Sequence, residues 1–88
     1  MGVKLSLPGY LQHFIENKET VEVDGATVRQ CLLNLALKYP AITPEIFDIN
    51  GKLAVIILHG EMPVGDDTLN RPVKNEDSII LFPIIEGG

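Results

Sequence analysis

Residues 27–40 decide the fold of this 88-residue chain, and they read Thr27-Val28-Arg29-Gln30-Cys31-Leu32-Leu33-Asn34-Leu35-Ala36-Leu37-Lys38-Tyr39-Pro40. Apolar residues recur there with the period of a helix that buries one side, at Val28, Cys31, Leu32, Leu35, Ala36 and Tyr39. Thr27 followed by Gln30 is the signature of a capping box, and Pro40 cannot continue a helix. The pattern predicts one main helix over residues 28–39.

Two segments before this helix alternate apolar and polar residues, as half-buried strands do, at residues 3–7 and 20–23. Pro8-Gly9 ends the first segment and Asp24-Gly25 follows the second, which makes a hairpin the simplest arrangement. Residues 10–14 are expected to form a loop or a short helical turn that covers one end of the core.

The segments after the helix predict three further strands. Residues 53–58 and 78–82 are apolar at both odd and even positions, which is typical of strands with apolar side chains on both faces. Pro83 has no N–H and is expected to end the last ladder. Residues 62–64 predict a short edge strand, and residues 43–47 predict a short second helix with Thr43 as its cap.

This order of strands and helices predicts a two-layer α+β domain with a single main helix on one face of the sheet. The other face, near the C-terminal strand, is expected to expose an apolar patch that serves as a protein interface. The alternative is that loops and the short second helix cover it. Leu33 and Leu37 lie beside the buried stripe of the main helix, so they indicate either a broad buried face or a partly exposed apolar flank.

Length and charge narrow the function classes. A chain of 88 residues with 45% hydrophobic residues fits one small domain that folds without disulfides or metal. A net charge of -5 argues against nucleic acid, because a phosphate binder needs a basic face, and it favours partners with basic pockets. No charged-then-apolar signal segment and no apolar run of membrane-spanning length is found, so we expect no membrane association and a cytoplasmic location.

Several residues that resemble chemical groups are expected to be structural. Cys31 is the only cysteine, which excludes an internal disulfide, and on the buried stripe it is expected to act as a small hydrophobe rather than a nucleophile. His13 and His59 lack metal-ligand spacing, so they are expected to be ordinary surface or turn histidines. The acidic pairs at residues 66–67 and 76–77 are too short for a cation site, so solvated turn residues are expected there.

The last seven residues, 82–88, carry the functional prediction, and they read Phe82-Pro83-Ile84-Ile85-Glu86-Gly87-Gly88. The terminal glycines leave no side chain beside the carboxylate, so the backbone can enter a narrow site. An ionised carboxyl is a poor electrophile that must be activated before it reacts. We therefore expect Gly88 to be the functional group of a carrier, with residues 1–83 as the folded domain and residues 84–88 as a flexible tail.

Several motifs together resemble the ubiquitin-like sulfur carriers, in particular the small subunit of molybdopterin synthase. They are the entry to the helix at Gly25-Ala26-Thr27-Val28, the apolar strand into His59-Gly60-Glu61, and the end at Ile79-Ile80-Leu81-Phe82-Pro83 followed by Gly87-Gly88. The resemblance spans essentially the whole chain. It implies a β-grasp fold in which the first and last strands lie side by side and one helix crosses the sheet.

The same resemblance implies how the tail acts. A ubiquitin-activating-like adenylyltransferase would adenylate Gly88 with ATP, and a sulfur donor would convert it to a thiocarboxylate. The loaded tail would then enter a larger synthase subunit, and the chain itself would bind no cofactor. Partner-binding residues would be Phe82, Pro83, Ile84, Ile85, Glu86 and Gly87. Alternatives are a carrier for thiazole, cysteine or a tungsten cofactor, a protein modifier joined to lysine through Gly88, or a plain interaction module.

Three residues depart from the family pattern. His59 stands where asparagine is common, and Glu76 stands where a glycine is usual. If that position has a positive φ, glutamate there costs about 1 kcal/mol. Glu86 adds a negative charge beside the reactive carboxylate, which suits a pocket with an additional cation or open solvent, or else Glu86 is a solvated tail residue.

Overall fold

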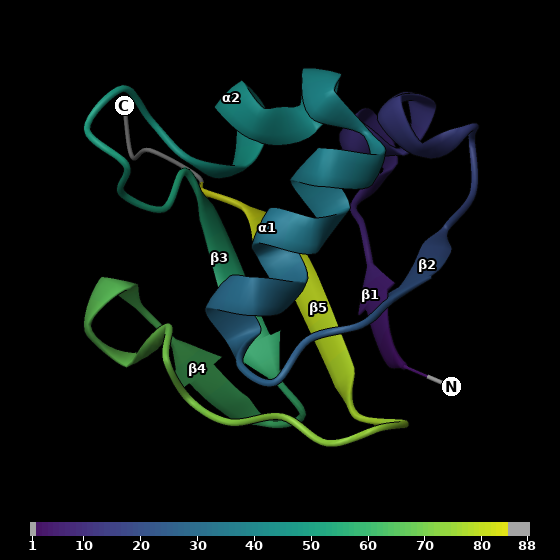
Figure 1. Ribbon diagram of the computed structural model, residues 1–88. Helices are drawn as coiled ribbons and strands as arrows, with labels where there is room; N and C mark the ends of the chain where they lie inside the picture. The colour runs from purple at the N-terminus through teal and green to yellow at the C-terminus, as the bar shows by residue number, and fades with distance from the viewer. Residues whose placement is uncertain (1, 85–88) are drawn as a thin grey trace.

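The computed structural model describes residues 2–84, which form a five-stranded mixed sheet in the order β2-β1-β5-β3-β4 with helices on one face (Figure 1). The strands are β1 (Val3–Ser6), β2 (Thr20–Val23), β3 (Val55–His59), β4 (Met62–Val64) and β5 (Ser78–Pro83). The α-helices are α1 (Val28–Lys38) and α2 (Thr43–Ile46), and the 3-10 helices are η1 (Gly9–Ile15), η2 (Pro40–Ile42) and η3 (Asp66–Thr68). The predicted α+β class and β-grasp arrangement are confirmed.

The first and last strands are neighbours at the centre of the sheet. β1 pairs with β2 as the predicted antiparallel hairpin and with β5 in parallel, and Leu5 lies between Val21 and Ile79. β5 pairs antiparallel with β3, which brings Ile57 opposite Leu81. These five side chains are buried, and they form the sheet half of the core.

Helix α1 supplies the other half of the core through its predicted stripe, and Val28, Cys31, Leu32 and Leu35 are all buried. The helix ends at Lys38, one residue before the predicted end. Tyr39 is its C-cap, and the Tyr39 N–H donates to the carbonyl of Leu35.

The first three N–H groups of α1, those of Val28, Arg29 and Gln30, all have hydrogen-bond partners. Thr27 Oγ1 accepts from the Gln30 N–H at 3.1 Å, as the capping-box prediction requires. The Gln30 side chain is bonded along the helix, where its Nε2 donates to Asn34 Oδ1 at 3.1 Å. The segment before β5 accepts the other two N–H groups. The Val28 N–H donates to the Arg71 carbonyl at 3.0 Å, and the Arg29 N–H donates to the Leu69 carbonyl at 2.8 Å.

A glycine at position 25 lets the chain pass close to this turn. A Cβ on Gly25 would lie 2.7 Å from the Cys31 Sγ and 2.8 Å from the Cys31 amide nitrogen. Both distances are shorter than real Cβ contacts, so a side chain at this position would force the chain away from α1.

Several predicted boundaries are wrong by a residue or two. Thr43 does not cap α2, because the N-cap is Ile42 and the Thr43 hydroxyl donates to the Pro40 carbonyl. β3 begins at Val55 rather than at residue 53, since Leu53 forms an isolated bridge with Phe47 before the sheet begins.

Glu76 has a φ of 73°, so this position does require the left-handed backbone that a glycine would adopt without strain.

Candidate functional site

The site that the sequence predicts begins where β5 ends. β1 pairs with β5 only as far as Ile80, so from Leu81 onward β5 has β3 alone beside it. As expected, the ladder ends at Pro83, which is the last residue of β5 and lies opposite Val55, one residue beyond the predicted strand. The Lys4 N–H donates to the Asp77 carbonyl, so the backbone groups of Asp77 point toward β1. Backbone groups alternate in direction along a strand, so those of Pro83 also point to the β1 side and away from β3. The missing N–H of Pro83 therefore removes no bond from the ladder with β3.

The face of the sheet away from α1 carries an apolar patch over β3 and β5. Ile56 lies opposite Phe82, and Leu58 lies opposite Ile80. Ile56 is 47% exposed and Phe82 is 41% exposed. We call these four residues the β3–β5 patch. The predicted exposed patch is confirmed, and α1 and α2 both lie on the opposite face of the sheet (Figure 1).

On β1 and β2 this face is polar. Lys4 of β1 lies opposite Glu22 of β2, and Ser6 lies opposite Thr20. The apolar area is therefore confined to the β3 and β5 half of the sheet, next to the point where the chain leaves β5.

Ile84 is the first residue beyond β5, and it is 48% exposed. It therefore extends the exposed apolar surface from Phe82 toward the end of the chain. The predicted site residues Ile85, Glu86, Gly87 and Gly88 lie outside the described residues. Of the predicted partner-binding residues, the structure places Phe82, Pro83 and Ile84 at one exposed corner of the sheet.

The comparison with protein families decides the assignment. The ThiS family matches residues 5–88, which is nearly the whole chain. The chain belongs to the ThiS family. Its members are ubiquitin-like sulfur carriers, so the coarse resemblance found in the sequence is confirmed.

Solved structures share the fold of this ThiS family chain over almost its full length. CysO from Mycobacterium tuberculosis has a TM-score of 0.85 and 24% identity, covering 96% of this chain and 100% of its own. A chain of the Amycolatopsis orientalis BexX/CysO complex has a TM-score of 0.83 and 23% identity, covering 99% of this chain and 100% of its own. The small archaeal modifier protein 1 from Methanosarcina acetivorans has a TM-score of 0.79 and 26% identity, covering 98% of this chain and 95% of its own. No curated protein matches the chain.

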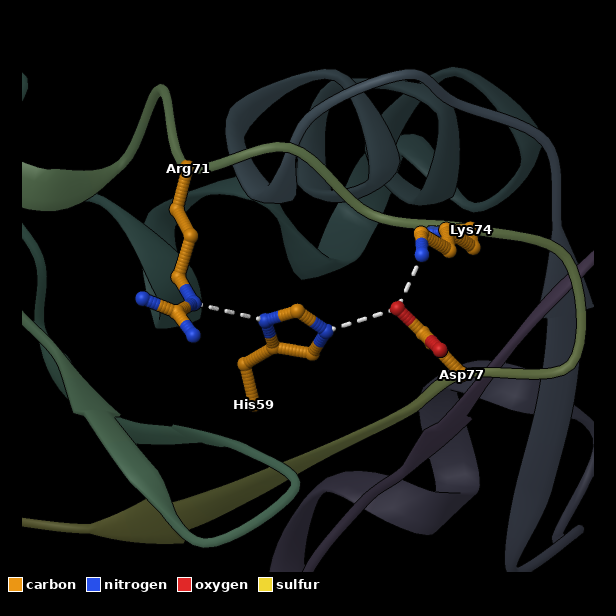
Figure 2. Close-up of polar contacts among 4 residues, drawn as sticks. All are labelled: His59, Arg71, Lys74 and Asp77. Atoms are coloured by element: carbon orange, nitrogen blue, oxygen red, sulfur yellow. Dashed lines mark hydrogen bonds and ion pairs between the residues drawn. The ribbon is translucent and has the colours of Figure 1, made fainter.

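A polar cluster at the other end of β5 was not predicted. His59 Nε2 lies 2.8 Å from Asp77 Oδ2, and Arg71 Nε donates to His59 Nδ1 at 3.0 Å (Figure 2). Because Nδ1 accepts, the imidazole is the neutral tautomer that donates from Nε2. The Lys74 backbone N–H also donates to Asp77 Oδ2 at 2.9 Å. This bond, followed by the bond from His59, holds the pKa of Asp77 below its usual value.

The cluster is structural rather than part of the tail site. It lies at the start of β5, whereas the tail leaves from the end of that strand. Arg71 also accepts the Val28 N–H through its carbonyl, so the cluster ties the N-terminus of α1 to β3 and β5. The four residues are spread over residues 59–77 with no local spacing motif, and no sequence signal was available to find them.

The remaining chemical candidates carry no catalytic geometry. Cys31 is fully buried, and burial, followed by the charges of Asp24 and Asp77, raises its pKa to about 11. The thiol is therefore protonated at neutral pH. Asp66 uses its carboxylate to accept the Leu53 N–H at 2.8 Å. Within residues 2–84, no group of three or more potential ligands is arranged to hold a metal ion, and no helix is both long and apolar enough to span a membrane.

Proposed function

We propose that this chain is a cytoplasmic sulfur carrier that delivers sulfur from the carboxyl group of Gly88 as the small subunit of molybdopterin synthase. The observation that carries the carrier role is the family match, which continues to residue 88 and so includes the diglycine. The exposed corner formed by Phe82, Pro83 and Ile84 supports it, because the diglycine segment follows from the surface of the domain, where a partner can dock.

The proposed chemistry takes place at one carboxyl group. A carboxylate oxygen of Gly88 attacks the α-phosphorus of ATP on an adenylyltransferase, which forms an acyl adenylate and releases pyrophosphate. Sulfur at the level of sulfide then displaces AMP to give the thiocarboxylate. When the sulfur passes to an acceptor and water supplies oxygen, Gly88 returns to a carboxylate. The chain contributes the carboxyl group and the docking surface, while its partners contribute catalysis.

The folded domain has to supply most of the binding energy. Ordering residues 84–88 in a partner costs ~1–2 kcal/mol of backbone entropy for each residue. The β3–β5 patch lies beside the start of this tail and offers apolar area that a partner can bury. A net charge of -5 favours partners with basic surfaces, and Glu86 next to the diglycine favours a tail channel with its own Lys or Arg.

A second candidate function is protein modification, in which Gly88 forms an isopeptide bond with a lysine. The relative named small archaeal modifier protein 1, at 26% identity, favours this reading. Delivery of sulfur to cysteine, thiazole or a tungsten cofactor uses the same activated carboxyl group and differs only in the acceptor. The shared prediction of all carrier branches is a thiocarboxylate at Gly88.

Intact-mass measurement separates these functions. The chain is incubated with an adenylyltransferase of the family, ATP and a sulfide donor, and then treated in its native state with a thiol-alkylating reagent. We expect a mass gain of one oxygen-to-sulfur exchange and one alkyl group on the loaded form. The buried Cys31 should stay unlabelled in the native protein, so the label reports on the thiocarboxylate.

The outcomes are distinct. Products larger than the chain, joined through lysine, would support the modifier, and an unchanged mass would refute both. A second measurement addresses the acceptor: the loaded chain is mixed with the large subunit of molybdopterin synthase and its pterin precursor. Loss of the sulfur without change in the precursor would reject the molybdopterin branch and leave the carrier role standing.

A further inference from the structure

An open groove lies between β2 and α1, at the edge of the sheet farthest from β4. Its volume is about 430 Å³, and it is lined by Glu22, Val23, Asp24, Asn34, Leu37 and Lys38. The proposed tail site does not use these residues. β2 is the outermost strand on this side of the sheet among the described residues, so the groove runs along a free strand edge.

Hydrogen-bond directions along β2 show which backbone groups face the groove side. The Leu7 N–H donates to the Glu19 carbonyl, so residue 19 points toward β1. Because backbone groups alternate in direction along an antiparallel ladder, the N–H and carbonyl groups of Val21 and Val23 point toward β1 as well. The N–H and carbonyl groups of Thr20 and Glu22 therefore point outward, free to pair with another strand. The outward carbonyl of Asp24 is already taken by the Asn34 side chain, which closes one end of this edge.

The helix side of the groove is lined by Asn34, Leu37 and Lys38, of which Leu37 is apolar. Leu37 is 78% exposed, and Leu33, one turn earlier on α1, is 43% exposed. The sequence left open whether these leucines widen the buried face or form an exposed flank, and the structure shows the exposed flank. A strand added beside β2 would direct every second side chain toward this helix and the intervening side chains toward the polar face of the sheet.

Two carboxylates, those of Glu22 and Asp24, lie at the edge where such a strand would bind, whereas Lys4 lies one strand further in, on β1 opposite Glu22. Thr20 and Glu22 face the side of the sheet away from α1, and the exposed carboxylate of Asp24 lines the end of the groove. Lys38 is the only basic residue in the groove lining. A second copy of the chain is a poor occupant, since it would bring its own Glu22 and Asp24 to the same edge and carries a net charge of -5.

We propose that the free edge of β2 and this groove bind an extended segment of a partner protein in which apolar residues alternate with lysine or arginine. The apolar side chains would pack on Leu37, and the basic side chains would lie beside Glu22. Thr20 and Glu22 would extend the sheet through their backbone groups. Because β2 and β3 lie on opposite sides of the central strands, the segment can bind while the tail of the same molecule occupies another partner.

The test uses a fluorescent octapeptide of alternating lysine and valine, titrated with the full chain and followed by anisotropy. We expect saturable binding, and no binding of the matching peptide of alternating glutamate and valine. Glu22→Lys should weaken binding by about fivefold or more, because it replaces an attraction with a repulsion. Asp67→Lys is the matched control: it makes the same change in net charge at an exposed residue outside the groove and should bind like the unchanged chain.

Amide exchange followed by NMR tests the backbone pairing directly. Peptide binding should slow the exchange of the Thr20 and Glu22 amides, while Val21, which already faces β1, should change little. Equal affinity of Glu22→Lys and Asp67→Lys, no binding at all, or perturbation centred on the β3–β5 patch would each overturn the proposal. A chain that lacks Gly87 and Gly88 should bind the peptide unchanged, so this result does not depend on the sulfur-carrier role.

Discussion

His59 Nε2 donates to Asp77 Oδ2 across 2.8 Å, and this bond joins the end of β3 to the start of β5. Asp77 also accepts the Lys74 N–H, so its carboxylate closes the turn before β5. Arg71 binds the far side of the imidazole and carries the connection to the first turn of α1. One histidine therefore links both layers of the domain at the end opposite the tail.

This cluster predicts how stability changes in acid. The pKa of Asp77 is lower in the folded protein than its ordinary value, so its contribution is present above the unfolded pKa and is lost as pH falls through the folded value. We expect the urea midpoint of the unchanged chain to drop between neutral pH and about pH 3, and Asp77→Asn to flatten part of that drop. Asp67→Asn removes the same charge at a site without these contacts. An equal flattening by Asp67→Asn would contradict the prediction.

The local elements of the fold were predictable because their causes are local. The buried stripe of α1, its Thr27 cap and the alternation of β1 and β2 all depend on residues a few positions apart. The exposed apolar face on β5 was predictable because the strand is apolar at both odd and even positions. A single main helix can cover only one of its two faces, so the other face is left exposed.

The remaining features depend on contacts between distant parts of the chain. His59 was expected to be an ordinary turn residue, and its role depends on Arg71 and Asp77, which follow it by 12 and 18 residues. The free edge of β2 likewise depends on which strands become neighbours, and no local pattern specifies that order. The tail residues 85–88 remain a prediction from the sequence and the family.

Glu76 is predicted to be a removable source of strain. Its φ of 73° lies in the left-handed region, and its N–H donates to the Gly2 carbonyl at 2.8 Å, which holds the backbone in place. Glu76→Gly should raise the free energy of unfolding by about 1 kcal/mol, measured by urea denaturation. Glu76→Ala removes the same side chain but keeps the Cβ. A gain in Glu76→Ala as large as in the glycine variant would mean that charge, not backbone strain, is responsible.

Gly25 is predicted to be required for packing against α1. Gly25→Ala places a methyl group within 2.7 Å of the Cys31 Sγ and should lower the free energy of unfolding by about 1–3 kcal/mol. Adding Cys31→Ala should restore only part of the loss, because the Cys31 amide nitrogen lies at 2.8 Å from the same point. Gly9→Ala is the control, since nothing lies within 4 Å of its Cβ position. Full recovery in the double variant would show that only the sulfur obstructs the methyl group.

Ile84 is predicted to contribute to partner binding and not to folding. It lies outside β5 and is 48% exposed, so Ile84→Asp should leave the urea midpoint unchanged. The same change should weaken association with the large synthase subunit about tenfold or more, measured by calorimetry, because a charge would enter an apolar contact. Leu37→Asp makes the same kind of change at an exposed residue of α1, on the opposite face of the sheet from the β3–β5 patch, and should leave this affinity unchanged. Wild-type affinity in Ile84→Asp would remove the corner after β5 from the interface.

The length of the tail is predicted to matter more than any side chain in it. Adenylation requires the carboxylate at one position in the activating enzyme, and each residue moves the chain end by ~3.3–3.6 Å. Deleting Gly88, or adding one alanine after it, should therefore abolish sulfur loading in the intact-mass assay. Both variants should keep the urea midpoint of the unchanged chain, because terminal residues outside a strand ladder generally carry little stability. Extending the N-terminus by one alanine is the control and should load normally. Loading of either tail variant at the normal rate would mean that the activated group is not the carboxylate of Gly88, and the carrier proposal would fail with it.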